Sequence, residues 1–387
     1  MVENAPITLL YEIGLLIVVS SFAIEIFKRI KLPGLIGAIL VGIFLGGPGG
    51  FGFVNDLNLI NTLAILGSVL ILFATGLEFD AESFWRSGKK AFLLTTVGVI
   101  SSILTGYLIG LALGWSERAA FLLGVVIAPS GTSVIAQVLN SQAKVQTKYG
   151  STLLTACVVD DVEGVLLISV ALGALSKESW QIGDVLWLSF ESIVFILLSI
   201  YLGSKLLPKA IYRFGKTLSE EVLFSILLGF GLILAFAATQ VGLAAITGAF
   251  IMGAIIPYRK IGEKIGHRLY MMKEVFATIF FTSIGLSINP YDLLNILPIS
   301  LAILAFALGA RLFGGVVGGL LGGLRQKVLL TSVIGLAIRA EMSFIIAREA
   351  VTKGIVSEQF LAVTTVIVTG SMLTILPLFS KLSAVTE

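Results

Sequence analysis

Residues 150–172, GSTLLTACVVDDVEGVLLISVAL, form an apolar run that is long enough to cross a lipid bilayer as a helix. Two adjacent carboxylates, Asp160 and Asp161, lie near its middle, and Glu163 follows closely. One charge at this depth costs about 2.5–3.5 kcal/mol on insertion scales. Because the two aspartates also repel each other, a segment that keeps both is expected to use them. We predict that they hold a cation or a proton at the middle of the membrane.

The composition of the whole chain is that of a membrane protein. The 387 residues are 57% hydrophobic and 13% charged, with a mean hydropathy of +1.04. A soluble domain of this size needs more charged surface. The recurring apolar runs predict an all-α polytopic membrane protein in which residues 1–387 form one membrane-embedded domain of about 13 spans. The predicted spans are 7–27, 32–50, 59–77, 91–113, 118–140, 150–175, 184–206, 220–239, 242–257, 275–289, 295–321, 329–352 and 358–380.

Lysine and arginine residues predict the orientation of these spans. Of the 26 basic residues, 20 fall on the side that follows the odd-numbered spans, and only Arg118, Lys177 and Lys353 fall on the other side. Such an excess marks the cytoplasmic face. We therefore predict a multi-pass protein of the cell membrane with its N-terminus outside and its C-terminus in the cytoplasm. The same bias accounts for the net charge of +3, so no nucleic-acid partner is expected.

Two predicted spans contain signals for a broken helix. The first includes APSGTSV at 128–134, where proline removes a backbone hydrogen bond and glycine weakens the helix. The second includes AIRAE at 337–341, with two charges in mid-span. Each is the middle member of a triplet of spans, and the two triplets run in opposite directions. Paired interrupted spans in inverted repeats point to a transport site at the midplane.

The residue types around the first break suit a small cation. Asp160 and Asp161 point about 100° apart on a helix, so each faces a different neighbouring helix. A hard monovalent cation such as Na⁺ prefers oxygen ligands, and Ser130, Thr132 and freed backbone carbonyls offer them. We predict that Asp161, Asp160, Thr132 and Ser130 bind the cation or the proton. The alternative, that both aspartates are fixed in structural ion pairs, remains open.

Arg311 lies inside span 295–321 with no other charge near it. An arginine at this depth needs an anionic partner, and Asp160 is the natural candidate. An anionic lipid or an anionic substrate is the alternative. The small residues around Arg311 would let another helix approach closely; these are Gly309, Ala310, Gly314 and Gly315.

The sequence allows more than one role for the remaining buried charges. Arg339 and Glu341 lie about 200° apart on an unbroken helix, so a break between them would let them cap the two half-helices. Direct contact of Glu341 with the ion is the other possibility. Glu163 shares a face with Asp160. It could extend the acidic path, or contact span 118–140 or Arg311.

Six features, taken in order, are similar to those of the monovalent cation:proton antiporter superfamily, in particular its NapA-like and Kef-like branch. They are KLPGLIGAILVGIFLGGPG, LFATGLEFD, APSGTSV, VVDDVEG, Arg311 and AIRAEMSFIIA. The resemblance covers nearly the whole chain. It implies the NhaA-like antiporter fold, in which two discontinuous helices cross within inverted repeats. It further implies a core subdomain at about 91–175 and 295–380, a dimerisation subdomain at about 7–77 and 220–289, and a linking helix at about 184–206.

The resemblance also implies a function. The implied function is the exchange of Na⁺ or Li⁺ for H⁺ by alternating access. The resemblance further implies a homodimer in the lipid membrane, with no enzymatic activity and no cofactor. Asp161 matches the aspartate that binds cation and proton in turn, and Asp160 matches its neighbour. Arg311 stands where electrogenic relatives have lysine. Because a guanidinium keeps its proton, Arg311 favours the hypothesis that Asp160 stays ionised and that one proton is exchanged per cation.

Other functions fit the sequence less well. A K⁺/H⁺ antiporter, Kef-like but without a regulatory domain, is the first alternative. An ion channel would need repeated selectivity loops. An intramembrane aspartyl protease would need its two aspartates on separate helices. A symporter of organic anions would need a larger polar cavity, so no organic substrate is expected.

Overall fold

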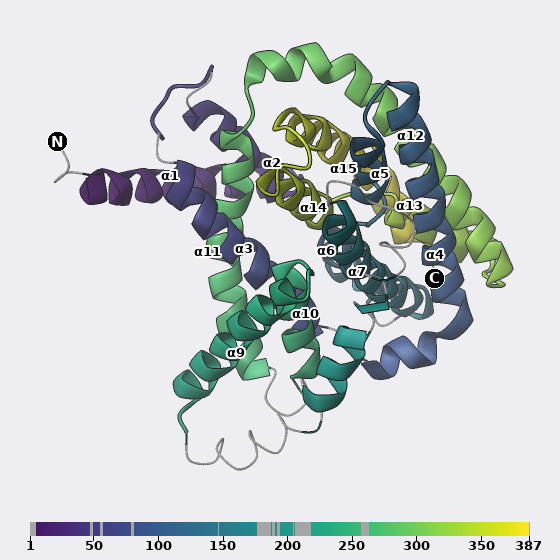
Figure 1. Cartoon of the computed structure of the whole chain (residues 1–387). Coiled ribbons are helices and arrows are strands. Elements are labelled where there is room, and N and C mark those ends of the chain that lie inside the picture. The colour runs from purple at the N-terminus through teal and green to yellow at the C-terminus, as the bar shows by residue number, and fades with distance from the viewer. Residues whose placement is uncertain are drawn as a thin grey trace. The chain divides into compact units, whose positions relative to one another are not determined.

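In a computed structural model of the chain, the structure describes residues 5–46, 49–54, 57–78, 81–145, 147–175, 218–256 and 263–386, with a few positions between 187 and 205. All regular secondary structure in these residues is helical (Figure 1). Eight of the described helices are long and apolar enough to cross a membrane, and shorter apolar helices accompany them. The predicted class, an all-α polytopic membrane protein, is confirmed.

The chain forms two compact units, each made from separate stretches of sequence. The first unit comprises Met1–Ile26, Gly37–Asp80 and Ile168–Ser287. The second comprises Phe27–Ile36, Ala81–Leu167 and Ile288–Glu387. Helix α7, Lys148–Leu175, contributes its first two thirds to the second unit and its last turns to the first. The segment with the adjacent aspartates therefore belongs to the second unit.

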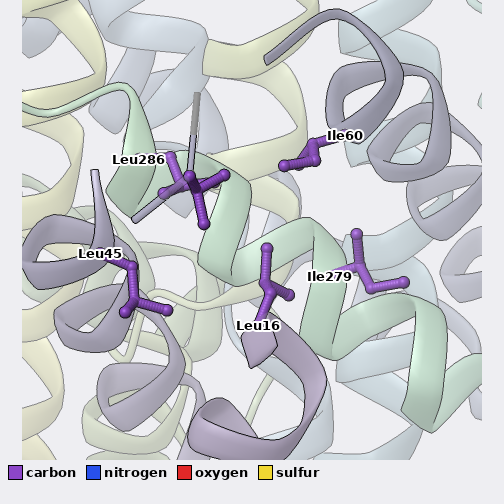
Figure 2. Close-up of a cluster of buried hydrophobic side chains, with 6 residues drawn as sticks. Leu16, Leu45, Ile60, Ile279 and Leu286 are labelled. Carbon is purple, nitrogen blue, oxygen red and sulfur yellow. The ribbon is translucent and has the colours of Figure 1, made fainter. Parts of the chain in front are cut away.

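The first unit is held together by apolar side chains and by close helix contacts. Its helices are α1 (Ala5–Arg29), α2 (Gly34–Leu45), α3 (Leu57–Glu78), α9 (Glu220–Gln240), α10 (Ala245–Ile255) and α11 (Glu263–Leu286). Leu16, Leu45, Ile60, Ile279 and Leu286 form part of one buried cluster (Figure 2). Glycines allow the backbones to touch, because a Cβ on Gly253 of α10 would lie 2.2 Å from the carbonyl oxygen of Phe73 on α3.

The second unit packs α4 (Ala81–Ala112) against α12 (Pro290–Leu321) along a row of glycines. A Cβ on Gly318 of α12 would lie 2.0 Å from the carbonyl oxygen of Leu93 on α4. Gly314 is similarly close, as the sequence predicted, whereas Gly309 faces open space with nothing within 4 Å of such a Cβ. Helix α15, Gln359–Val385, completes this packing against α12.

Both predicted helix breaks are present in the second unit. The first separates α5 (Glu117–Val126) from α6 (Thr132–Ser141), and the second separates α13 (Gln326–Leu336) from α14 (Glu341–Thr352). The two breaks meet, since the backbone N–H of Gly131 donates to the carbonyl oxygen of Ile338 at 2.8 Å. Unpaired backbone groups are costly in a membrane unless they find such partners.

The helices extend beyond the predicted apolar spans at some ends. Helix α4 begins at Ala81, but its apolar part, Lys89–Ala112, agrees with the predicted span 91–113. Helix α11 begins at Glu263 and its apolar part at Gly266, so the predicted start at residue 275 was wrong. Hydropathy marks only the apolar part of a helix, whereas backbone hydrogen bonding continues into the charged turns before it. The predicted linking helix at 184–206 lies partly outside the described residues, and Val194–Gly203 within it is an apolar helix.

Candidate functional site

The site is built where α7 passes the two helix breaks of the second unit. Asp160 and Asp161 lie midway along α7 and are 0% and 6% exposed. Helix α6 begins with Thr132, and the N-terminal end of a helix carries a partial positive charge that favours nearby anions. The start of α6 is therefore a favourable place for the two neighbouring carboxylates.

Both carboxylate oxygen atoms of Asp160 accept hydrogen bonds. The backbone N–H and the hydroxyl of Ser130 each donate to Asp160 Oδ2, both at 2.6 Å. On the other side, Nη2 of Arg311 from α12 donates to Asp160 Oδ1 in a buried ion pair. The partner that the sequence predicted for Arg311 is thus the one observed. With three donors around it, the negative charge of Asp160 is well compensated.

Asp161 bonds to the same broken span as Asp160, so the prediction that each aspartate faces a different helix holds only for the contact of Asp160 with α12. The Oδ1 atom of Asp161 accepts from the hydroxyl of Thr132 at 2.9 Å. Thr132 is the first residue of α6, so Asp161 too is bonded at the start of that half-helix.

The second break carries one charge on each side. Arg339 is completely buried between α13 and α14, and its Nη1 donates to the carbonyl oxygen of Leu336 at 3.1 Å. The same nitrogen donates to the carbonyl oxygen of Pro129 at 3.4 Å, and so bridges both breaks. Its backbone N–H donates to Ser371 Oγ at 2.9 Å. Arg339 therefore caps the C-terminal end of α13, as one of the sequence hypotheses proposed.

Glu341 is the first residue of α14, where a negative charge is favourable at a helix N-terminus. Its Oε2 accepts from the hydroxyl of Ser133 at 2.9 Å. Thr132 and Ser133 are adjacent in the first turn of α6, and each donates to a carboxylate of a different helix. Two acids thus flank the start of α6.

Glu163 contacts α4, a partner that the sequence did not suggest. The hydroxyl of Thr96 donates to Glu163 Oε1. Within the described residues, Glu163 Oε2 is buried without a hydrogen-bond partner, and so is Nη1 of Arg311. Buried polar atoms without partners are uncommon and costly in proteins.

The sequence prediction identified most of the residues that the structure brings together. Asp160, Asp161, Ser130, Thr132, Arg311 and Arg339 lie within one network, and Glu341 joins it through Ser133. The sequence prediction missed Thr96, Ser133 and Ser371. In the sequence, these residues are marked only by a hydroxyl group inside an apolar span. Such residues are common in membrane helices because they can bond to their own backbone, so this signal does not single them out.

The site gathers oxygen atoms of the kind that small cations and protons bind. Carboxylate and hydroxyl oxygens converge at the start of α6, and a hard cation prefers such ligands. Two crossed helix breaks with buried acids, inside a bundle of apolar helices, define the class of ion-transporting membrane proteins.

The comparisons with known proteins identify the family. Residues 15–381 match the family of the transmembrane sodium/hydrogen exchangers, and the chain belongs to this family. It is 27% identical over 350 residues to the probable Na⁺/H⁺ antiporter GerT of Bacillus cereus, covering 90% of this chain and 92% of the relative. It is 26% identical over 369 residues to the Na⁺/H⁺-K⁺ antiporter GerN of the same organism, covering 94% of both.

A solved structure has the same fold. The sodium proton antiporter MjNhaP1 from Methanocaldococcus jannaschii, at pH 8, superposes with a TM-score of 0.74, covering 98% of this chain and 97% of that one. The identity is 17%, so this likeness establishes the antiporter fold alone.

Proposed function

We propose that the protein exchanges Na⁺ or Li⁺ for H⁺ across the membrane, and that Asp161 carries the cation and the proton in turn. The observation that carries this proposal is that two adjacent buried aspartates of α7 meet hydroxyl groups at the start of α6. Asp160 bonds to Ser130 and to Arg311, and Asp161 bonds to the hydroxyl of Thr132. A hydroxyl can donate to an ionised carboxylate and can accept from a protonated one.

In the proposed cycle, a proton on Asp161 neutralises its charge, and the site can then be exposed to the other side of the membrane. When the proton leaves, Asp161 and an oxygen of Asp160 bind the dehydrated cation, with the hydroxyls of Ser130 and Thr132 completing its oxygen ligands. Since both species need the same carboxylate oxygens, they exclude each other. This exclusion couples the two fluxes. The exchange needs no cofactor.

The supporting charges have electrostatic roles in this proposal. Arg311 is buried against Asp160 and offsets part of the negative charge that remains when the cation is absent, whereas Arg339 holds the two helix breaks together. Glu341 at the start of α14 and Glu163 beside Thr96 provide negative charge on either side of the aspartates. We assign the second unit as the moving core and the first unit as the dimerisation part. The protein would act as a homodimer with its N-terminus outside and its C-terminus in the cytoplasm.

K⁺ is the alternative cation. The name of the relative GerN includes both Na⁺ and K⁺. We favour Na⁺ because the family is that of the sodium/hydrogen exchangers and the relative GerT is named a probable Na⁺/H⁺ antiporter.

The direct test uses purified protein in proteoliposomes that contain a pH-sensitive dye. Adding Na⁺ or Li⁺ to acidified vesicles should raise the internal pH, and K⁺ should have a much smaller effect. Asp161→Asn should abolish the response, because an amide can neither take up the proton nor balance the cation. Activity that survives in Asp161→Asn would overturn the assignment.

A further inference from the structure

The end of α15 is bonded to both broken spans. Gln142 directly follows α6, and its side-chain Nε2 donates to the carbonyl oxygen of Ser380 at 2.8 Å and to the Ser380 hydroxyl at 3.2 Å. Thr331 lies in α13, and its hydroxyl shares a hydrogen bond of 2.9 Å with the hydroxyl of Thr386. The last turns of α15 therefore contact one half-helix of each broken span.

Lys144 adds a charged donor at the same end of α15. Its Nζ donates to the carbonyl oxygen of Thr386 at 3.0 Å, and Thr386 is the C-cap residue of α15. The last carbonyl groups of a helix lack partners within the helix and carry a partial negative charge, so a lysine is favourable there. The turn before Lys144 is itself ordered, because the backbone N–H of Lys144 donates to the carbonyl oxygen of Leu139 at 2.8 Å. We call the five side chains of these contacts the clip; they are Gln142, Lys144, Thr331, Ser380 and Thr386.

Helix α6 lies between the clip and the candidate cation site. Its first residue, Thr132, donates to Asp161 Oδ1 at 2.9 Å, and its last residue, Ser141, is next to Gln142. The helix has ten residues, so it is about 15 Å long. Rigid secondary elements of this kind carry a displacement from one end to the other. The contacts at the end of α6 therefore bear on the place of the Thr132 hydroxyl.

The body of α6 is held by few side chains. Its buried residues are Val134, Ile135 and Leu139, and the remaining residues are partly or fully exposed. A segment with few buried apolar contacts opens locally at low cost. Hydrogen bonds at the two ends of α6 thus contribute a large share of what fixes its direction.

We propose that the clip is a positioning device for the exchange: it fixes the far end of α6, and so keeps the Thr132 hydroxyl in place for the cation. The inference rests on the proposed function, in which this hydroxyl is a ligand. With the clip intact, α6 is held at both ends. When the clip is broken, the end of α6 keeps only its apolar contacts, and the hydroxyl spends less time in its bonding position beside Asp161.

Lys144→Met tests the clip, because methionine keeps a long apolar side chain and removes the donor. In proteoliposomes the Na⁺ concentration for half-maximal exchange should rise about fivefold, as expected for the loss of one hydrogen bond, and the maximal rate should stay within about twofold. Lys381→Met is the matched control, because Lys381 is an exposed lysine near the same end of α15. It should leave the half-maximal concentration unchanged, and so should Lys144→Arg, which keeps a charged donor.

Combination with Thr132→Val shows whether the clip acts through Thr132. Once the hydroxyl is absent, its position no longer matters, so Lys144→Met should then add no further rise in the half-maximal Na⁺ concentration. A further rise in the double variant would overturn the proposal. Equal half-maximal concentrations in Lys144→Met and Lys381→Met would overturn it as well.

Hydrogen–deuterium exchange tests the clip without any transport step. The backbone amides of residues 132–144 should exchange faster in Lys144→Met than in Lys381→Met, because α6 is released at one end. Equal exchange in the two variants would contradict the proposal. Absence of a Na⁺-driven pH change with the unaltered protein would instead refute the proposed function.

Discussion

Gly131 and Ile338 join the two broken helices through one backbone hydrogen bond, from the N–H of the former to the carbonyl oxygen of the latter, 2.8 Å long. The two residues are far apart in the sequence, and each lies in the irregular stretch between two half-helices. The bond satisfies two of the polar groups that the breaks expose, which a membrane protein must do internally. It also fixes the start of α6, and with it Thr132, relative to the second break.

Gly131→Ala should destabilise this crossing. A Cβ at position 131 would lie 2.6 Å from the Cβ of Ala340, so the two breaks would have to separate. Overpacking of this kind typically costs about 1–3 kcal/mol. Thermal unfolding of the purified protein in detergent measures the effect. Gly229→Ala on α9, where a Cβ would meet nothing within 4 Å, is the control and should unfold at the unaltered temperature.

Removing the partner of Asp160 should be strongly destabilising. Arg311→Met would leave a completely buried carboxylate without its cation, and breaking a buried pair in this way costs about 3–5 kcal/mol. The double variant Arg311→Met with Asp160→Asn should recover part of this loss, since no uncompensated charge remains. The free energies of unfolding of the two single variants and the double variant, taken as a cycle, give the coupling. Strictly additive effects would contradict the assigned pair.

The hydroxyl of Thr132 should matter for cation affinity more than for stability. Thr132→Val keeps the shape of the side chain and removes the donor to Asp161 Oδ1. We expect the half-maximal Na⁺ concentration to rise about tenfold, in line with the 1–3 kcal/mol associated with an unsatisfied buried group. Thr132→Ser retains the hydroxyl and should stay close to the unaltered protein. If valine and serine gave the same value, the hydroxyl would have no part in binding.

We predict that Arg339 stabilises the fold and does not bind the ion. Its Nη1 bonds to the carbonyl oxygens of Leu336 and Pro129, one at each break. Arg339→Met would leave both carbonyls short of a donor, so we expect a loss of stability of about 2–4 kcal/mol. In the fraction that folds, the Na⁺ concentration for half-maximal exchange should be little changed. A large change in that concentration with normal stability would instead assign Arg339 to the ion site.

The main features of the fold were predictable because they follow from local rules. Pro129 and Gly131 lie close together and both disfavour a continuous helix, and charges such as Arg339 and Glu341 are costly in lipid. The partner of Arg311 was predictable for the same reason, since a buried arginine needs an acid and Asp160 lies at matching depth.

The other features could not be predicted from the sequence, because they depend on tertiary packing. Nothing local distinguishes Gly98 from other glycines in membrane helices, and its contact with Arg311 appears only when α4 and α12 are packed together. The partner of Glu163 is equally non-local, because Thr96 is 67 residues away. The start of α11 at Glu263 was missed because its first turns are polar, so the hydropathy of the sequence rises only after the helix has begun.

The central claim is that Na⁺ and H⁺ compete for the carboxylate of Asp161. Equilibrium binding of radioactive sodium to the purified protein over a range of pH tests this claim without any transport step. We predict that, on the acidic side, the apparent dissociation constant rises about tenfold for each unit by which the pH falls, as linkage to one proton requires. We also predict that Asp161→Asn binds little sodium at any pH. Sodium affinity that is independent of pH, or unaltered binding by Asp161→Asn, would contradict the account.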